Sequence, residues 1–166
     1  MPGSGKSSIA RRVARVTGRR CVDVDSEIER VEGRAIPEIF AAEGEAGFRD
    51  VEARVLREVL ASEEPLVVAT GGGAVLRDEN RAVMRERGTV VWLRATPETL
   101  LRRVGDGSSR PLLAGDPLGN LVRLLDERGA AYAAAAHEAI DTDDLPFDEI
   151  TERVLAAAGL TAEVRS

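Results

Sequence analysis

The chain has 166 residues, which is enough for one domain with a buried core. Hydrophobic residues make up 43% of the sequence and aromatic residues only 3%, so aliphatic side chains must build that core. The formal net charge of −6 argues against nonspecific nucleic-acid binding, and a single cysteine, Cys21, excludes an internal disulfide and fits a reducing compartment. No stretch reaches the roughly 20 apolar residues that cross a membrane, so we expect a cytoplasmic protein without a membrane partner.

The first residues match a phosphate-binding loop. Residues 1–8 read MPGSGKSS, the second half of the pattern GxxxxGK[ST], in which the hydroxyl of Ser7 would bind Mg²⁺. Gly3 and Gly5 allow backbone N–H groups to turn towards phosphate oxygens, and the following helix directs its positive dipole end to the same anion. Lys6 is the only lysine of the chain, and its flexible ammonium can bridge phosphate oxygens where a planar guanidinium fits poorly. A disordered Gly/Ser-rich terminus is the alternative. An amphipathic helix and a βα pattern follow at once, however, which favours phosphate binding.

Strand and helix patterns alternate along the rest of the chain. We expect helices from the loop to Gly18 and over 26–31, 36–42, 45–60, 78–87, 96–104, 118–136 and 147–157, and strands over 21–25, 66–70, 89–93 and 139–142. The strands are short and apolar on both faces, which indicates a parallel sheet with helices on both sides. Residues 105–117 are rich in Gly, Ser, Asp and Pro, which predicts a surface loop. The predicted fold class is therefore α/β, in a single domain over 1–166.

Two aspartates, Asp23 and Asp25, end the first predicted strand. Alternation along a strand puts both carboxylates on one side and Val24 on the other. Ligands of open α/β sheets bind at the carboxyl ends of the strands. Beside a nucleotide, one carboxylate can hold a water of Mg²⁺ and the other can take a proton from an attacking hydroxyl. The alternative is that Asp25 and Ser26 only cap the next helix.

A run of three glycines, Gly71, Gly72 and Gly73, leaves the second predicted strand directly. Most turns need one glycine, whereas three in succession allow the backbone to approach a small polar ligand closely. The alternative is a flexible turn without a ligand.

Three arginines on separate segments complete the set of candidates. Arg49 lies on a predicted helix, Arg110 in the surface loop and Arg128 on the Ala-rich helix. A guanidinium suits a carboxylate, and an arginine in a loop suits phosphates during transfer. Each could instead be a solvated surface charge, and Arg49 could pair with Glu52 one helical turn on. The only histidine, His137, has no Cys or His nearby in the sequence for a metal site, and we interpret it as a surface residue.

Five segments, in this order along the chain, resemble the shikimate kinase family: GSGKSS, CVDVDSEIE, IPEIFAAEGEAGFRDVE, LVVATGGGAV and SSRPLLAG. The similarity extends from Met1 to about Ala157, and FRxxE combined with a strand that ends in GGG is not a general feature of P-loop proteins. The resemblance implies a nucleoside-monophosphate-kinase-like P-loop fold, a three-layer sandwich whose parallel sheet has the strand order 2-3-1-4-5. It also implies that ATP, with Mg²⁺, phosphorylates the 3-hydroxyl of shikimate to shikimate 3-phosphate in aromatic amino-acid biosynthesis. We expect the protein to act as a monomer.

The same resemblance implies a role for individual residues. Catalysis would involve Lys6, Asp25 and Arg110, with Asp25 as the candidate base. Shikimate would be bound by Asp25, Arg49, Gly71, Gly72, Gly73 and Arg128, in a binding region at about 25–62. The nucleotide would contact Gly3, Ser4, Gly5, Lys6, Ser7, Ser8, Arg103 and Arg110. Arg103 would lie against adenine, and Arg110, in a lid at about 105–117, would approach the phosphates on closure. Ser7 and, through water, Asp23 would hold Mg²⁺.

Two departures from the family pattern affect these expectations. The stretch after Thr142 reads DDLP, without the arginine that commonly lies near adenine in the family. The first strand of the family sheet is missing, so we expect a chain that is truncated inside the phosphate-binding loop or assigned a wrong start, with marginal stability. Two alternatives stay open: a gluconate-kinase-like enzyme, whose substrate also carries a carboxylate, and a nucleotide-binding remnant without activity.

Overall fold

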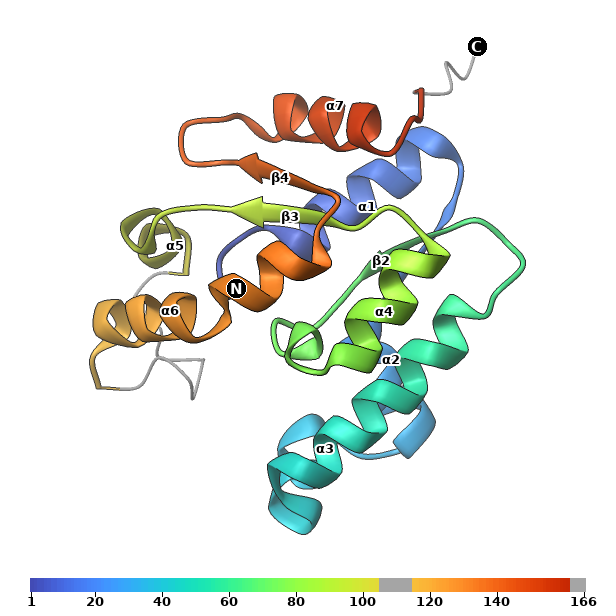
Figure 1. Ribbon diagram of the computed structural model, residues 1–166, viewed down its shortest axis with the longest axis vertical. Helices are drawn as coiled ribbons and strands as arrows, with labels where there is room; N and C mark the ends of the chain where they lie inside the picture. Colours follow the sequence, from blue (N-terminus) through green and yellow to red (C-terminus); the bar gives the residue numbers. More distant parts are fainter. Residues whose placement is uncertain (105–114, 162–166) are drawn as a thin grey trace.

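The computed structural model describes residues 1–104 and 115–161. Within them, four strands form two parallel pairs (Figure 1). The strands are β1 (Arg20–Asp23), β2 (Leu66–Ala69), β3 (Val91–Arg94) and β4 (Glu138–Asp141). β1 pairs with β2 and β3 with β4, with Asp23 opposite Ala69 and Arg94 opposite Asp141. The α/β class with parallel strands, predicted from the alternation of patterns, is confirmed.

Helical segments connect the strands. They are α1 (Lys6–Thr17), α2 (Val24–Glu32), α3 (Ile36–Leu60), the 3₁₀ segment η1 (Ala74–Leu76), α4 (Asp78–Arg87), α5 (Pro97–Val104), α6 (Pro117–Ala135) and α7 (Phe147–Ala157). The two helices predicted over 36–42 and 45–60 form the single element α3, which is interrupted at Gly44, where φ is 69° and ψ is −174°. In the described part of the chain, no helix has the length and apolar character needed to span a bilayer.

The boundary between β1 and α2 differs from the prediction. We expected the strand to continue to Asp25 and Ser26 to cap the next helix, but β1 ends at Asp23 and α2 begins at Val24. The reason is local, because the Oδ1 atom of Asp23 accepts the backbone N–H of Asp25 at 3.1 Å and that of Ser26 at 3.4 Å. Asp23 is thus the N-cap of α2, a role for which aspartate is well suited. Asp25 consequently lies in the first turn of a helix and not in a strand.

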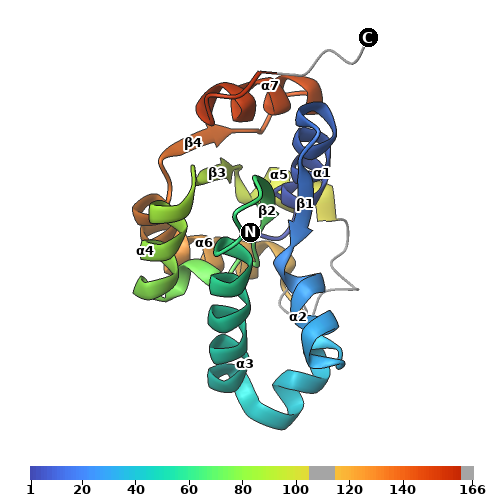
Figure 2. The same ribbon diagram turned by 90° about the vertical axis from the view of Figure 1, so that its right-hand side faces the viewer.

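Helices cover both faces of the strands, which gives three layers (Figures 1 and 2). On one face, α1 and α7 pack on β3 and β4 through a cluster of aliphatic side chains: Ile9, Val13, Leu93, Ile140, Ile150 and Leu155. On the other face lies a larger cluster, to which each of the helices α2, α3, α4, α5 and α6 contributes. It includes Ile28, Ile39, Leu56, Met84, Leu100 and Leu121. As expected from the composition, aliphatic side chains dominate both clusters.

The two strand pairs are separated by an apolar cavity. Neither β2 nor β3 pairs with a strand of the described chain along the edge that faces the other pair. The cavity has a volume of about 550 Å³, and Val67 and Val68 of β2, Val91 and Trp92 of β3 and the buried Met1 are among the residues that line it. The amino terminus accordingly lies in the middle of the molecule (Figures 1 and 2). This arrangement agrees with the expected order 2-3-1-4-5 when its central strand is missing.

Candidate active site

The predicted phosphate-binding residues lie together at the start of α1. Gly5 is the N-cap of this helix with φ 80°, and Gly3 has φ 75°. A Cβ on Gly3 would lie 2.7 Å from the carbonyl oxygen of Leu100, so only glycine fits there. Lys6 Nζ donates to the Met1 carbonyl at 2.9 Å and lies 3.5 Å from the hydroxyl of the buried Ser4. The ammonium therefore folds back over the loop, where it and the helix N-terminus can act on one anion.

Ser7 and Asp23 form the predicted metal-binding pair. The Ser7 hydroxyl donates to Asp23 Oδ2 at 2.8 Å, which brings the first turn of α1 next to the carboxyl end of β1. Ser8, the next residue, is exposed. Among the described residues, no group of three or more His, Cys, Asp or Glu side chains could enclose a metal ion. A hydroxyl and one carboxylate fit Mg²⁺, which keeps several waters and shares phosphate oxygens rather than entering an all-protein cage.

Asp25 is surrounded by both cations and carboxylates. Its side chain reaches solvent, but the protein around it raises the pKa of the carboxyl above its usual value, chiefly by burial. The negative charges of Asp23 and Glu52 raise this pKa further, while Lys6 and Arg49 lower it. The charges of both Lys6 and Arg49, the predicted phosphate-binding and acid-binding cations, therefore act on this carboxylate.

The three glycines form the turn at which the other candidates meet, and we call residues 71–73 the glycine turn. A Cβ on Gly71 would lie 2.9 Å from Asp25 Oδ1 and 2.9 Å from Glu52 Oε1. A Cβ on Gly73 would collide with the guanidinium of Arg49. These side chains come from α2 and α3, so the turn after β2 joins segments far apart in the sequence. The close contacts argue against a merely flexible turn.

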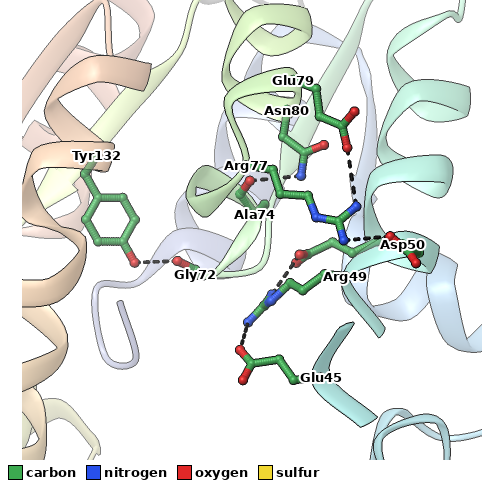
Figure 3. Close-up of polar contacts among 10 residues, drawn as sticks. Glu45, Arg49, Asp50, Gly72, Ala74, Arg77, Glu79, Asn80 and Tyr132 are labelled. Carbon is green, nitrogen blue, oxygen red and sulfur yellow. Dashed lines mark hydrogen bonds and ion pairs between the residues drawn. The ribbon is translucent and has the colours of Figure 1, made fainter. Parts of the chain in front are cut away.

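Arg49 contacts both its own helix and the glycine turn. It pairs with Glu45 at 3.6 Å (Figure 3) and with Glu52 at 2.7 Å. Its guanidinium also lies 5.2 Å from the ring centroid of Phe48. The pair with Glu52, which the sequence offered as an alternative, is therefore present. Its side chain is only 14% exposed, however, and it also faces Gly73, so it is not a solvated surface charge. Within the described chain, Arg49 Nε and Glu52 Oε1 are buried and have no hydrogen-bond partner.

Arg128 approaches the same turn from α6. It is buried, and its Nη1 atom would lie 3.6 Å from a Cβ on Gly72. One helical turn further on, Tyr132 donates a hydrogen bond of 2.6 Å to the Gly72 carbonyl (Figure 3). Two arginines on different helices thus face one turn, which suits a carboxylate.

The sequence did not predict that two further residues, Glu52 and Tyr132, contact the glycine turn. Glu52 was considered only as a rival partner of Arg49, yet it also faces Gly71. The FRxxE spacing could have indicated it, because three residues along a helix bring the two side chains together. Tyr132 lies four residues after Arg128, and that spacing was the available signal.

The predicted adenine-side residue, Arg103, is tied to the loop after β4. Its guanidinium donates to the hydroxyl of Thr142 at 2.9 Å and also to the Thr142 carbonyl. Thr142 is fully buried, so this contact fixes the end of α5 against the start of the DDLP stretch. Arg110 and most of the predicted lid at 105–117 lie outside the described residues.

Comparisons with known proteins agree on one family. A family model described as shikimate kinase matches residues 2–158. A shikimate kinase of Symbiobacterium thermophilum is 47% identical over 156 residues, which cover 92% of this chain and 89% of that protein. One of Nitrobacter winogradskyi is 46% identical over 93% of this chain and 72% of its own length. Among solved structures, a shikimate kinase from Acinetobacter baumannii in complex with shikimate superposes with a TM-score of 0.86 at 40% identity, over 93% of this chain and 87% of that one. A shikimate kinase from Aquifex aeolicus gives a TM-score of 0.80 at 34% identity, over 93% and 90% of the two chains.

Proposed function

The chain belongs to the shikimate kinase family, and from this premise we propose that it transfers the γ-phosphoryl group of ATP to the 3-hydroxyl of shikimate. The observation that carries the proposal is the convergence on the glycine turn. Asp25, Arg49 and Arg128 reach this turn from three different helices, and the charge of Lys6 also acts on Asp25. Groups suited to a hydroxylated acid therefore lie beside groups suited to phosphates.

The phosphate side of the site would bind the nucleotide. Gly3, Ser4 and Gly5 would surround the phosphates with backbone N–H groups, and Lys6 would lie against the transferred group. Ser7 and, through water, Asp23 would hold Mg²⁺, which when bound neutralises charge on the phosphate oxygens. Ser8 continues the first turn of α1. At the adenine end we assign Arg103, held by Thr142, and we assign Arg110 to the phosphates.

The acid side of the site would bind and orient shikimate. Arg49 and Arg128 would hold the carboxylate, and the glycine turn would allow the ring to approach the backbone closely. The pair between Arg49 and Glu52 would keep the guanidinium in the orientation that the carboxylate needs. With the carboxylate fixed at one end, the 3-hydroxyl at the other end of the ring would face Asp25.

In the chemical step, Asp25 would accept the proton of the 3-hydroxyl as its oxygen attacks the γ-phosphorus. The bond from that phosphorus to the bridging oxygen of ADP breaks at the same time. Lys6 would stabilise the negative charge on the transferred group, and most of the rate enhancement would come from positioning and electrostatics.

The experiment is a coupled assay of ADP release with the purified chain, ATP and Mg²⁺, and with shikimate or gluconate as acceptor. We expect turnover with shikimate and only background release with gluconate. Turnover with gluconate instead would assign the acid pocket to a different sugar acid. Calorimetric titration with ADP gives the remaining outcome, because ADP binding without turnover of either acid would indicate a nucleotide-binding remnant.

A further inference from the structure

Side chains of α4 and α6 hold the backbone carbonyls in and after the glycine turn. Tyr132 Oη donates to the carbonyl of Gly72 at 2.6 Å, Asn80 Nδ2 to that of Ala74 at 2.9 Å, and an Arg81 guanidinium nitrogen to that of Val75 at 2.6 Å (Figure 3 shows the first two). Tyr132 is thus the side chain that holds the middle glycine itself.

All three glycine carbonyls are used inside the protein. Gly71 accepts the N–H of Ala74 at 3.2 Å and Gly73 that of Leu76 at 3.0 Å, while Gly72 accepts the Tyr132 hydroxyl. In the part of the chain that the structure describes, the N–H groups of these glycines have no hydrogen-bond partner. The glycine turn therefore keeps its acceptors occupied and its donors available, which suits an anionic ligand.

Tyr132 is held firmly enough to determine this arrangement. Its side chain is buried, and its ring stacks on Trp92 with centroids 5.4 Å apart. The hydroxyl also accepts a hydrogen bond from the Met1 amino group at 3.3 Å. Burial raises the pKa of the phenol, against a smaller opposing effect of Arg128, so the hydroxyl stays protonated near neutral pH and can donate to Gly72.

We propose that Tyr132 is a positioning residue for the acid pocket: its hydroxyl fixes the Gly72 carbonyl so that the glycine N–H groups and Arg128 face the substrate carboxylate together. The inference rests on the proposed function, because the carboxylate is taken to be that of shikimate. Tyr132 itself does not touch the acid. If the hydroxyl only satisfied a buried carbonyl, its removal would lower the stability of the protein but would not raise the KM for shikimate more than the KM for ATP.

The test is Tyr132→Phe, which removes the hydroxyl and keeps the ring. We expect KM for shikimate to rise about five- to tenfold, with kcat and the KM for ATP within about twofold of the parent. The matched control is Thr17→Val, which removes a buried hydroxyl that donates to the Val13 carbonyl at 2.8 Å on α1. It should change neither KM. An unchanged shikimate KM in Tyr132→Phe, or an equal rise in both, overturns the proposal.

A second variant tests the same contact from the other side. A Cβ on Gly72 would lie 3.3 Å from Tyr132 Oη, so Gly72→Ala should displace the hydroxyl and raise the shikimate KM. In the Tyr132→Phe background the added methyl group has no hydroxyl to displace. The rise in the shikimate KM of the double variant should therefore be smaller than the product of the rises in the two single variants. Fully multiplicative effects overturn the proposal.

One readout separates this proposal from the proposed function. If the parent protein does not turn over shikimate, the proposed function fails, but hydrogen exchange at the amides of Ala74 and Leu76, which bond to the carbonyls of Gly71 and Gly73, still reports how firmly the turn is held. We expect exchange at these two amides to be about five- to tenfold faster in Tyr132→Phe than in Thr17→Val. Equal rates in the two variants overturn the positioning role.

Discussion

At the scale of single residues, Arg49 offers the sharpest test of the acid pocket. We predict that Arg49→Ala raises the KM for shikimate about 30- to 100-fold and the KM for ATP less than about threefold, because a buried charged partner of the carboxylate is lost. Steady-state kinetics with each substrate varied in turn will show this. Arg54→Ala is the control on the same helix, since Arg54 pairs with Glu32 and Glu58 and is 43% exposed. Equal rises for both substrates would contradict the assignment of Arg49 to the acid.

A second prediction concerns the base. Asp25→Asn keeps the size of the side chain and removes the proton acceptor, so kcat should fall about 100- to 10,000-fold while the KM for ATP changes little. Asp126→Asn, at an exposed position of α6, should leave kcat unchanged. The measurement is the initial rate at saturating substrates. A loss of less than about tenfold would mean that another group takes the proton or that none is needed.

The residues predictable from the sequence are those whose neighbours are close along the chain. Lys6 and Ser7 were recognised because a loop of fixed spacing defines their surroundings. Tyr132 was not, because its partner Gly72 is 60 residues away and only the folded chain brings them together. For Arg49 the sequence offers two interpretations. The pair with Glu52 forms, and the guanidinium also faces Gly73, whereas the binding of an acid by Arg49 stays a prediction.

At the scale of elements, the β1–α2 boundary shows where pattern reading fails. The alternation in CVDVD favoured a strand up to Asp25, but the side chain of Asp23 satisfies two N–H groups that a helix start leaves without partners. Capping thus prevailed over alternation. Oδ1 of Asp23 accepts the N–H groups at the start of α2, while Oδ2 accepts the hydroxyl of Ser7. One carboxylate therefore serves both the fold and the proposed metal site.

These two roles of Asp23 can be separated. Asp23→Asn keeps an amide oxygen for the cap, so the free energy of unfolding should stay within about 0.5 kcal/mol of the parent, whereas Asp23→Ala should lose about 0.5–2 kcal/mol. Both variants lose the charge beside Ser7, so the Mg²⁺ concentration for half-maximal activity should rise about tenfold in each. Urea unfolding and Mg²⁺ titration of the rate measure the two effects. A parent-like Mg²⁺ dependence in Asp23→Asn would remove Asp23 from the metal site.

At the scale of the whole molecule, strand alternation predicted a parallel α/β fold but not the lateral order of the strands. Parallel neighbours are joined by long crossovers, so nothing local in the sequence states which strands pair. The order came from the family resemblance, and the pairs β1–β2 and β3–β4 agree with it. The lid role of Arg110 stays a prediction, because residues 105–114 lie outside the described structure.

The cavity between β2 and β3 leads to the last prediction. An extension of about five apolar residues before Met1 has the length of a typical strand and could pair with both edges at once. Burying four or five aliphatic side chains at ~1.5–3 kcal/mol each gives about 6–15 kcal/mol, which is an upper estimate of the gain. We therefore expect a smaller stabilisation of about 5 kcal/mol and a melting temperature about 10–20 °C higher. Calorimetry of the extended and parent chains measures this shift.

The control for this prediction is a Gly/Ser extension of equal length, which supplies the same backbone but no apolar side chains and should leave the melting temperature nearly unchanged. Trp92 lines the cavity and gives a local readout, because a strand beside it should protect its fluorescence from acrylamide. The apolar extension should reduce quenching, whereas the Gly/Ser extension should not. Equal melting temperatures and equal quenching for both extensions would show that the space between the strand pairs does not accept a strand, and that the two half-sheets owe their stability to the helical layers alone.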